Sequence, residues 1–258
     1  MRWAFITDIH ANRQAFEAVL ADARAHGATR FALLGDFVGY GADPAWVVDQ
    51  VMALVADGAI AVQGNHDEAV ANGSTPTMHP DARAVIDWTR AQLSEDQLRF
   101  LSRLPLQVNG EPGQCLFVHA NAFDPKHWEY VQGRAEAVKS LHASAARIQV
   151  CGHMHDPMLF HLSGTGKAGD FRPVAGVPMP LPAHRQWLII PGSCGQPRDG
   201  NPAACYALLD PSRSELDDAR ITFQRVAYDV DAACDALQAT SLPPPIAHRL
   251  ARRLTYGE

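Results

Sequence analysis

The 258-residue sequence has few cysteines and no long apolar run, and each shortage excludes a class of protein. Its five cysteines are scattered and no two form a Cys-x-x-Cys pair, which argues against a disulfide framework and against a thiolate zinc site. No stretch of about 18 apolar residues could span a bilayer, and the N-terminus lacks the pattern of a secretory signal. We therefore expect a cytoplasmic protein with no membrane partner.

Positive charge is also sparse, since the formal net charge is -6 and Lys and Arg form no run. Binding to a polyanion needs a concentrated basic surface, so we expect no obligate nucleic-acid partner. With 47% apolar residues the chain can bury a full core, and we expect a single domain over residues 1–258. Nothing in the sequence predicts an oligomeric state.

Short apolar runs alternate with helical patterns in the first half of the chain, which is typical of β-α-β units and predicts parallel strands. Asn12 is the predicted N-cap of the first helix. The predicted strands are Arg2–Thr7, Phe31–Leu34, Ala59–Val62, Cys115–Val118, Ile148–Cys151, Met158–Leu162, Trp187–Ile190, Cys205–Leu209 and Arg220–Ala227. The predicted helices are Arg13–His26, Pro44–Asp57, a helical stretch over 80–103, Val230–Ala239 and Pro244–Leu254.

The later strands are separated by few helices, which favours a second, mixed or antiparallel sheet and an α/β sandwich overall. Residues 163–186 are rich in Gly and Pro and are too long for an ordinary hairpin loop. We expect this segment to be a mobile lid, a partner-facing segment or a surface loop without a function.

Side chains able to bind metals come directly after the ends of several predicted strands. They lie in the segments FITDIH, LLGD, VQGNHD, LFVH and VCGHMH. In an open α/β sheet, ligands bind beyond the carboxyl ends of the strands, so we expect these side chains to converge. They are Asp8, His10, Asp36, Asn65, His66, Asp67, His119, His153 and His155.

Each of these residues taken alone more often caps a helix or stabilises a turn than binds a metal. Burying them together costs on the order of several kcal/mol unless cations or hydrogen bonds compensate. The mixture of imidazole, carboxylate and amide, without thiolate, suits Mn, Fe, Zn, Co or Ni and does not choose among them.

The order D-x-H, G-D, G-N-H-D, a later His and G-H-x-H resembles the calcineurin-like metallophosphoesterase superfamily, and the match runs from Asp8 to His155. Residues Ile189–Asp210 are similar to the Pro-Gly-Ser-x-Gly-Gln-Pro-Arg segment of its small bacterial phosphodiesterase branch. The resemblance implies a four-layer α/β/β/α sandwich of two mixed sheets flanked by helices. It also implies two divalent metal ions, with manganese expected first and Fe, Zn, Ni or Co as alternatives.

The resemblance further implies a role for each matching residue. A hydroxide bridging the two metals would attack phosphorus, Asp36 would bridge the metals, and His66 would act as the general acid toward the leaving oxygen. Asp67 would either orient His66 or, as we expect, cap a helix over Glu68–Asn72. The implied ligands are Asp8, His10, Asp36 and His155 for one metal, and Asp36, Asn65, His119 and His153 for the other.

Two departures from the family pattern bear on the substrate. The second block reads GDFVGYG, with Gly39 and Tyr40 where the protein phosphatases have an Asp and an Arg. The loss of this phosphate-binding Arg, which the symmetrical dinucleoside tetraphosphatases also have, favours the phosphodiesterase branch. Ala11 stands where Gly is usual, which is tolerable if its φ is negative.

Substrate contacts are harder to predict. Arg198 could hold a phosphate with two hydrogen bonds, or form a salt bridge with Asp199 or another surface carboxylate. The aromatic residues after His119 could stack on a leaving group, but we expect them to pack against the body of the protein. These residues are Phe123, His127, Trp128 and Tyr130.

We predict a phosphodiesterase acting on a small-molecule phosphoester. The alternatives are a phosphomonoesterase or dinucleoside polyphosphatase, and a non-catalytic binding module.

Overall fold

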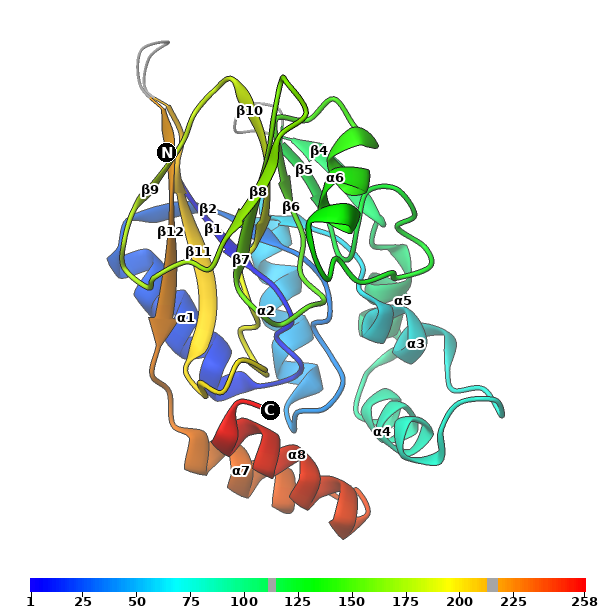
Figure 1. The fold of residues 1–258 in the computed structure, drawn as a ribbon. Coiled ribbons are helices and arrows are strands. Elements are labelled where there is room, and N and C mark those ends of the chain that lie inside the picture. The colour runs from blue at the N-terminus through cyan, green and yellow to red at the C-terminus, as the bar shows by residue number, and fades with distance from the viewer. Residues whose placement is uncertain (111–114, 213–217) are drawn as a thin grey trace.

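The computed structural model describes residues 1–110, 115–212 and 218–258 (Figure 1). The strands are β1 (Arg2–Ile6), β2 (Ala28–Leu33), β3 (Ile60–Ala61), β4 (Gln107–Gly110), β5 (Cys115–Val118), β6 (Ile148–Val150), β7 (Met158–Ser163), β8 (Ala168–Phe171), β9 (Met179–Leu181), β10 (Arg185–Ile190), β11 (Ala204–Asp210) and β12 (Ala219–Val226). The helices are α1 (Arg13–Ala25), α2 (Pro44–Ala56), α3 (Asn65–Asn72), α4 (Pro80–Ala91), α5 (Glu95–Arg103), α6 (Arg134–His142), α7 (Val230–Gln238) and α8 (Pro244–Tyr256).

The strands form two six-stranded sheets, ordered β3-β2-β1-β11-β12-β9 and β4-β5-β6-β10-β7-β8. Both sheets are mixed. In the first, β1, β2 and β3 are parallel, as the helical crossovers between them require, whereas β11, β12 and β9 are antiparallel to their neighbours. In the second, β5, β6 and β10 are parallel. The predicted pair of mixed sheets is therefore confirmed.

The side chains of β1 show how one strand serves two layers. Trp3 and Phe5 point into the core between the sheets, where both contact Phe117 of β5, with ring centroids 6.1 and 5.7 Å apart. Ala4 and Ile6 point to the other side, where α1 and α2 pack. This alternation follows from the period of two of a strand. With α6 covering the outer face of the second sheet, the layers are α/β/β/α, as predicted.

Several elements differ from the prediction. The helical stretch over 80–103 is two helices, because Ser94 caps α5 by accepting a hydrogen bond from the backbone N–H of Gln97 (3.2 Å). Strand β4 and helix α6 were not predicted. The segment 163–186, expected to be a loop, contains β8 and β9, which pair with β7 and β12 at the edges of the two sheets.

The chain ends in the helical pair α7 and α8, which lies at one end of the sheets beside α4 (Figure 1). The contact between these helices is apolar: Val85 of α4 belongs to the same buried cluster as Leu237 of α7 and Leu250 of α8. Within the described ranges, no helix is both long enough and apolar enough to cross a membrane.

Candidate metal centre

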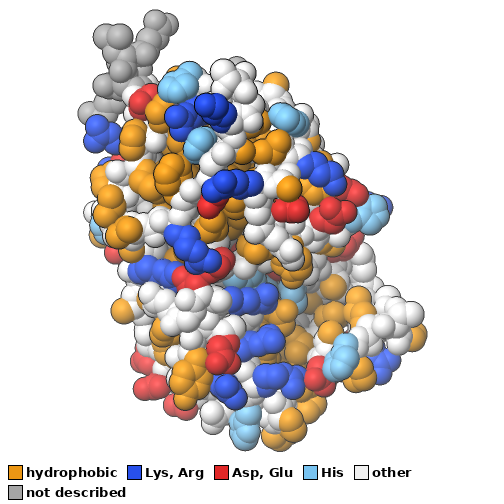
Figure 2. Space-filling view, in the orientation of Figure 1, with side chains coloured by type: hydrophobic (Ala, Val, Ile, Leu, Met, Phe, Trp, Pro, Cys, Tyr) orange, Lys and Arg blue, Asp and Glu red, His pale blue; other side chains and the backbone are white. Residues whose placement is uncertain are grey.

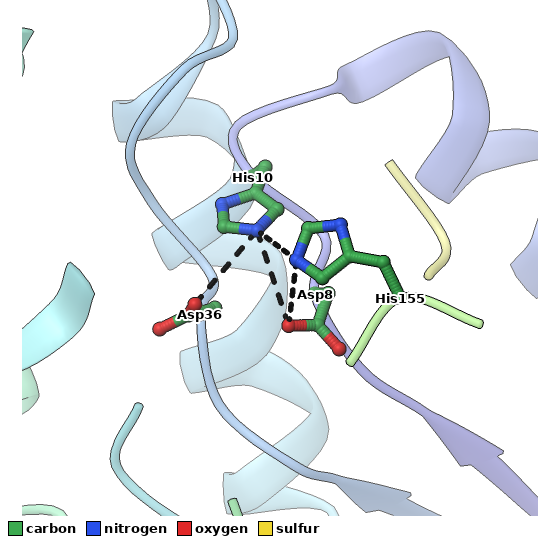
Figure 3. Close-up of side chains that lie close together, drawn as sticks. All are labelled: Asp8, His10, Asp36 and His155. Atoms are coloured by element: carbon green, nitrogen blue, oxygen red, sulfur yellow. Dashed lines mark hydrogen bonds and ion pairs between the residues drawn. The ribbon is translucent and has the colours of Figure 1, made fainter. Parts of the chain in front are cut away.

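The parallel strands of both sheets direct their carboxyl ends to one edge, and the candidate ligands lie in the loops that follow these ends. Asp8, His10, Asp36 and His155 form one buried cluster in which the side chains point toward one another (Figure 3). Asp36 also belongs to a second buried cluster, with His119 and His153. In each cluster the potential ligand atoms lie within 4.8 Å of one another. Segments far apart in the sequence thus meet at Asp36.

In the first cluster, the Nε2 atoms of two histidines face each other. His10 Nε2 lies 3.1 Å from His155 Nε2, and His155 Nε2 lies 3.2 Å from Asp8 Oδ1. His10 Nε2 is also 3.8 Å from Asp36 Oδ2. These four side chains are the ones that the resemblance assigned to one metal.

In the second cluster, His119 Nε2 is the central atom. It lies 3.4 Å from Asp36 Oδ2, 3.2 Å from Asn65 Oδ1 and 3.2 Å from His153 Nδ1. Asn65 is the first residue of α3, and this position brings its amide oxygen to the centre. These residues are the ones that the resemblance assigned to the second metal.

The opposite ring nitrogens explain why a cation fits here. The Nδ1 atoms of His10, His119 and His155 face the backbone carbonyls of Val38 (3.2 Å), Leu34 (2.7 Å) and Gln196 (2.6 Å). A carbonyl can only accept, so each Nδ1 donates, and in the neutral ring Nε2 carries a lone pair. The lone pairs of His10 and His155 therefore point at each other, which is unfavourable unless a cation lies between them. Histidines that bind metals are held by the other nitrogen in this manner.

The pKa values of the cluster support the same conclusion. Burial lowers the pKa of His10 well below its usual value and, together with the charge on His119, that of His153 to about 4, so both rings are neutral at pH 7. Burial alone would raise the pKa of Asp36, but nearby His119 and His66 hold it well below its usual value. Burial disfavours the charged form of His119, yet Asp36 raises its pKa to about 9. The space beside Asp36 attracts positive charge.

The backbone under these ligands adopts an uncommon conformation. The φ angles of Asp8 and His10 are 52° and 50°, in the left-handed region that costs a non-glycine residue roughly 1–2 kcal/mol. Backbone hydrogen bonds from Asp8 to Gly35 (3.1 Å) and from His10 to Asp36 (2.9 Å) hold this conformation. Ala11 has a φ of 51°, so the condition under which Ala replaces the usual Gly without strain is not met. Asp36, His153 and His155 also have positive φ.

Asp67 helps to cap α3 as the third residue of the helix, and not as its N-cap residue. Helix α3 begins at Asn65, so Asp67 lies in its first turn and not at its N-cap, and no hydrogen bond joins it to His66 in the described structure. Its carboxylate accepts hydrogen bonds from the backbone N–H groups of Phe37 (2.9 Å) and Gly64 (3.0 Å). Asp67 therefore ties the loop that carries Asp36 to the helix that carries Asn65 and His66.

His66 lies beside the candidate metal ligands. Its backbone N–H donates to Asp36 Oδ1 (2.8 Å), and its ring centroid lies 5.0 Å from that of His10 and 4.5 Å from that of Tyr40. A Cβ atom at Gly39 would lie 2.6 Å from His66 Nδ1, so Gly39 leaves the space that this ring occupies. In the sequence, Gly39 and Tyr40 were notable only because the Asp and Arg of the protein phosphatases are absent there. In the structure these two residues position His66.

Two of the aromatic residues after His119 contact candidate ligands. The Tyr130 ring stacks on His153 with centroids 4.1 Å apart, and Trp128 lies edge-on to His119 at 5.7 Å. Trp128 Nε1 also donates to a carboxylate oxygen of Glu68 (3.1 Å). His127 is paired with Asp124, and Phe123 lies under Lys139.

The loop after β10 is held against the first cluster and carries Arg198. Ser193 Oγ donates to the backbone oxygen of Asp8 (2.8 Å), and Gln196 accepts from His155. Asp199 pairs with Arg225, so a salt bridge between Arg198 and Asp199 is not formed. Arg198 instead donates to Gln196 Oε1 (3.2 Å) and approaches the ring of Tyr40, with Cζ 6.0 Å from the centroid.

Two mixed sheets with helices on both outer faces, and clustered carboxylates and histidines at one strand edge, define an α/β/β/α sandwich with a candidate metal centre. Residues 1–214 match the family model of the calcineurin-like phosphoesterase superfamily domain, and the chain belongs to this family. Membership implies a phosphoester hydrolase.

Related chains extend this likeness to the whole length. The chain is 33% identical over 250 residues to an uncharacterized protein of Methanocaldococcus jannaschii, covering 96% of each. It is similar to the crystal structure of a metallophosphoesterase from Sphaerobacter thermophilus, with a TM-score of 0.84, 33% identity and 100% of both chains covered. A hypothetical protein from Pyrococcus horikoshii shares the fold, with a TM-score of 0.77, 18% identity, and 100% and 98% of the two chains covered.

Proposed function

We propose that this chain is a metal-dependent phosphodiesterase with a dinuclear centre that Asp36 bridges. The convergence of histidine ring nitrogens on both sides of the Asp36 carboxylate carries the proposal. His10 and His155 lie on one side, and His119 and His153 lie on the other. A single structural metal needs only four ligands and a closed shell, whereas this centre offers more.

Each half of the centre offers a full ligand set. One ion would be held by Asp36 together with Asp8, His10 and His155. The other ion would be held by the same Asp36 carboxylate together with the other side chains of a second set. Imidazole with oxygen ligands suits a borderline or hard divalent ion, and we expect manganese, with Fe, Zn, Ni or Co able to replace it. The second set is Asp36, Asn65, His119 and His153.

Bound ions would supply a nucleophilic water near neutral pH and neutralise charge on the phosphoryl oxygens. His66 lies at the rim of this centre and is half-buried, so it can face the substrate without being a ligand. We assign it the proton that the leaving oxygen must receive. The hydrogen bond from its backbone to Asp36 fixes its distance from the centre. Arg198 would bind an oxygen of the transferred phosphoryl group.

The diester is favoured over the monoester because Tyr40 occupies the position where the phosphatase branches have an Arg. A monoester carries more negative charge than a diester and depends more on such a cation. A phosphomonoesterase or dinucleoside polyphosphatase would use the same ligands. A non-catalytic binding module has no need of a half-buried histidine beside a complete ligand set.

The test is the hydrolysis of a bis-aryl phosphodiester beside the matching aryl monoester, by chelator-treated protein to which Mn²⁺ is returned. Cleavage of the diester that returns with the metal would support the proposal. Preference for the monoester would replace it with the phosphatase alternative. Cleavage of neither ester by protein with bound metal would favour the binding module.

A further inference from the structure

A groove lined by α4 and α8 begins at the metal centre. It has a volume of about 260 Å³, and His66 and Tyr40 lie at its inner end. Its floor is apolar, formed by Val85 and Ile86 of α4 and by residues of α8 such as Leu250. Figure 2 shows basic side chains gathered over α8 on the face that carries this hollow. The match to the family model ends at residue 214, so α8 lies outside the matched domain.

Two arginines approach Tyr40 from different elements. Arg253 of α8 and Arg198 of the loop after β10 each place Cζ 6.0 Å from the centroid of the Tyr40 ring. Within the described ranges neither has a carboxylate partner, although neighbouring arginines do. Arg249 pairs with Asp81 (2.7 Å), and Arg252 pairs with Glu258 (3.5 Å).

A half-buried guanidinium without a carboxylate partner is suited to an anion that arrives with a ligand. Both Arg198 and Arg253 are half-buried. These two cations lie on Tyr40, which borders the inner end of the groove together with the proposed general acid His66.

The two arginines lie on different sides of Tyr40, one in the loop after β10 and one on α8. Arg198 follows Gln196, whose backbone oxygen contacts the candidate ligand His155, so Arg198 is placed to bind the phosphoryl group. Arg253 lines the wall of the groove. His66 must lie on the leaving-group side of the phosphorus if it is to protonate the leaving oxygen. The leaving group then extends from His66 into the groove, past Arg253.

We propose that the α4–α8 groove binds the leaving group of the substrate and that Arg253 binds an anionic group on it. The substrate class is a phosphoester whose leaving alcohol has an apolar body and a carboxylate or phosphate. The apolar body contacts the floor at Val85, Ile86 and Leu250, and the anion forms charge-assisted hydrogen bonds with the guanidinium. This proposal rests on the proposed function.

The test uses two esters of the type that the wild-type enzyme cleaves, with 4-(carboxymethyl)phenol and its neutral carboxamide as leaving groups. The two phenols have similar reactivity and differ in charge. We expect kcat/KM of the wild-type enzyme to be roughly tenfold higher for the carboxylate ester. Arg253→Met should remove this preference, because kcat/KM for the carboxylate ester falls more than kcat/KM for the carboxamide ester. Arg253→Lys, which keeps the charge, should retain part of the preference.

Arg252→Met is the matched control, because Arg252 lies on the same helix, is exposed and is paired with Glu258. It should leave the preference intact. Equal cleavage of the two esters by the wild-type enzyme, or an equal loss for both esters in Arg253→Met, would overturn the groove proposal. Failure of the proposed function looks different, because the wild-type enzyme with metal would then cleave neither ester.

Discussion

Replacing Asp36 with Asn tests the role of the shared carboxylate with almost no change in shape. The side chain is 1% exposed, and its Oδ1 accepts a hydrogen bond from the His66 backbone that an amide oxygen can also accept. Without the Asp36 charge the pKa of His119 falls, and the new amide N–H group can donate to the lone pair of the neutral ring at Nε2, which lies 3.4 Å from Oδ2 in the wild type. We therefore expect the protein without metal to keep its fold, with a free energy of unfolding within about 1 kcal/mol of the wild-type value.

The same substitution should remove most of the stabilisation by metal. An ion present at about 100 times its Kd stabilises the folded state by about 2.7 kcal/mol, and two such ions by about 5 kcal/mol. In a chain of this size each kcal/mol shifts Tm by roughly 2–4 °C. Chelator-treated wild-type protein should thus gain about 10 °C or more with saturating Mn²⁺, and Asp36→Asn should gain far less and lose at least about 10³-fold in kcat.

The assay is thermal unfolding with and without Mn²⁺, together with elemental analysis of the bound metal. Asp87→Asn, at an exposed position of α4, is the control and should behave as the wild type. If Asp36→Asn bound two ions per chain and showed the wild-type thermal shift, the assignment of Asp36 as the bridging ligand would be refuted.

Three further substitutions test other parts of the site. His66→Gln should lower kcat by roughly 10²–10⁴-fold while two metals remain bound, as measured by steady-state kinetics and elemental analysis; loss of metal would instead make His66 a ligand. Gly64→Ala would bring a Cβ against the backbone and carboxylate of Asp36, so metal binding should be lost and denaturant unfolding should show a cost of about 2–4 kcal/mol. The control Gly164→Ala, which meets no atom within 4 Å, should change stability by less than about 0.5 kcal/mol. Asn12→Ala should cost about 1–2 kcal/mol in urea unfolding, because Asn12 caps α1 and donates to the oxygen of Gly195 (2.9 Å); an unchanged midpoint would contradict this.

The sequence predicts the fold well where hydrophobic periodicity and crossovers are strong. Strands β1, β2 and β3 and helices α1 and α2 follow directly from apolar runs, a capping Asn12 and an opening Pro44. The edge strands β8 and β9 were missed because they are short and interrupted by Gly169 and Pro180, and their conformation depends on the neighbouring strands β7 and β12. Helix α6 was missed for lack of a strongly amphipathic pattern, since its buried residues include Ser140.

The candidate ligands could be identified from the motifs, because each block follows a strand and the strands share an edge. Their backbone conformation could not, since Asp8, His10 and Ala11 have positive φ only because the surrounding loops impose it. The environment of Arg198 was also hidden, because it depends on Asp199 pairing with Arg225 and on α8 bringing Arg253 to the same ring. Such contacts between distant segments leave no local signal in the sequence.

The most direct test of the central claim is anomalous diffraction from crystals of the protein soaked in Mn²⁺. We predict two anomalous peaks about 3.5–4 Å apart, one between Asp8 and His155 and one between Asn65 and His119, with the Asp36 carboxylate between them. A single peak, or two peaks that do not share Asp36, would contradict a dinuclear centre.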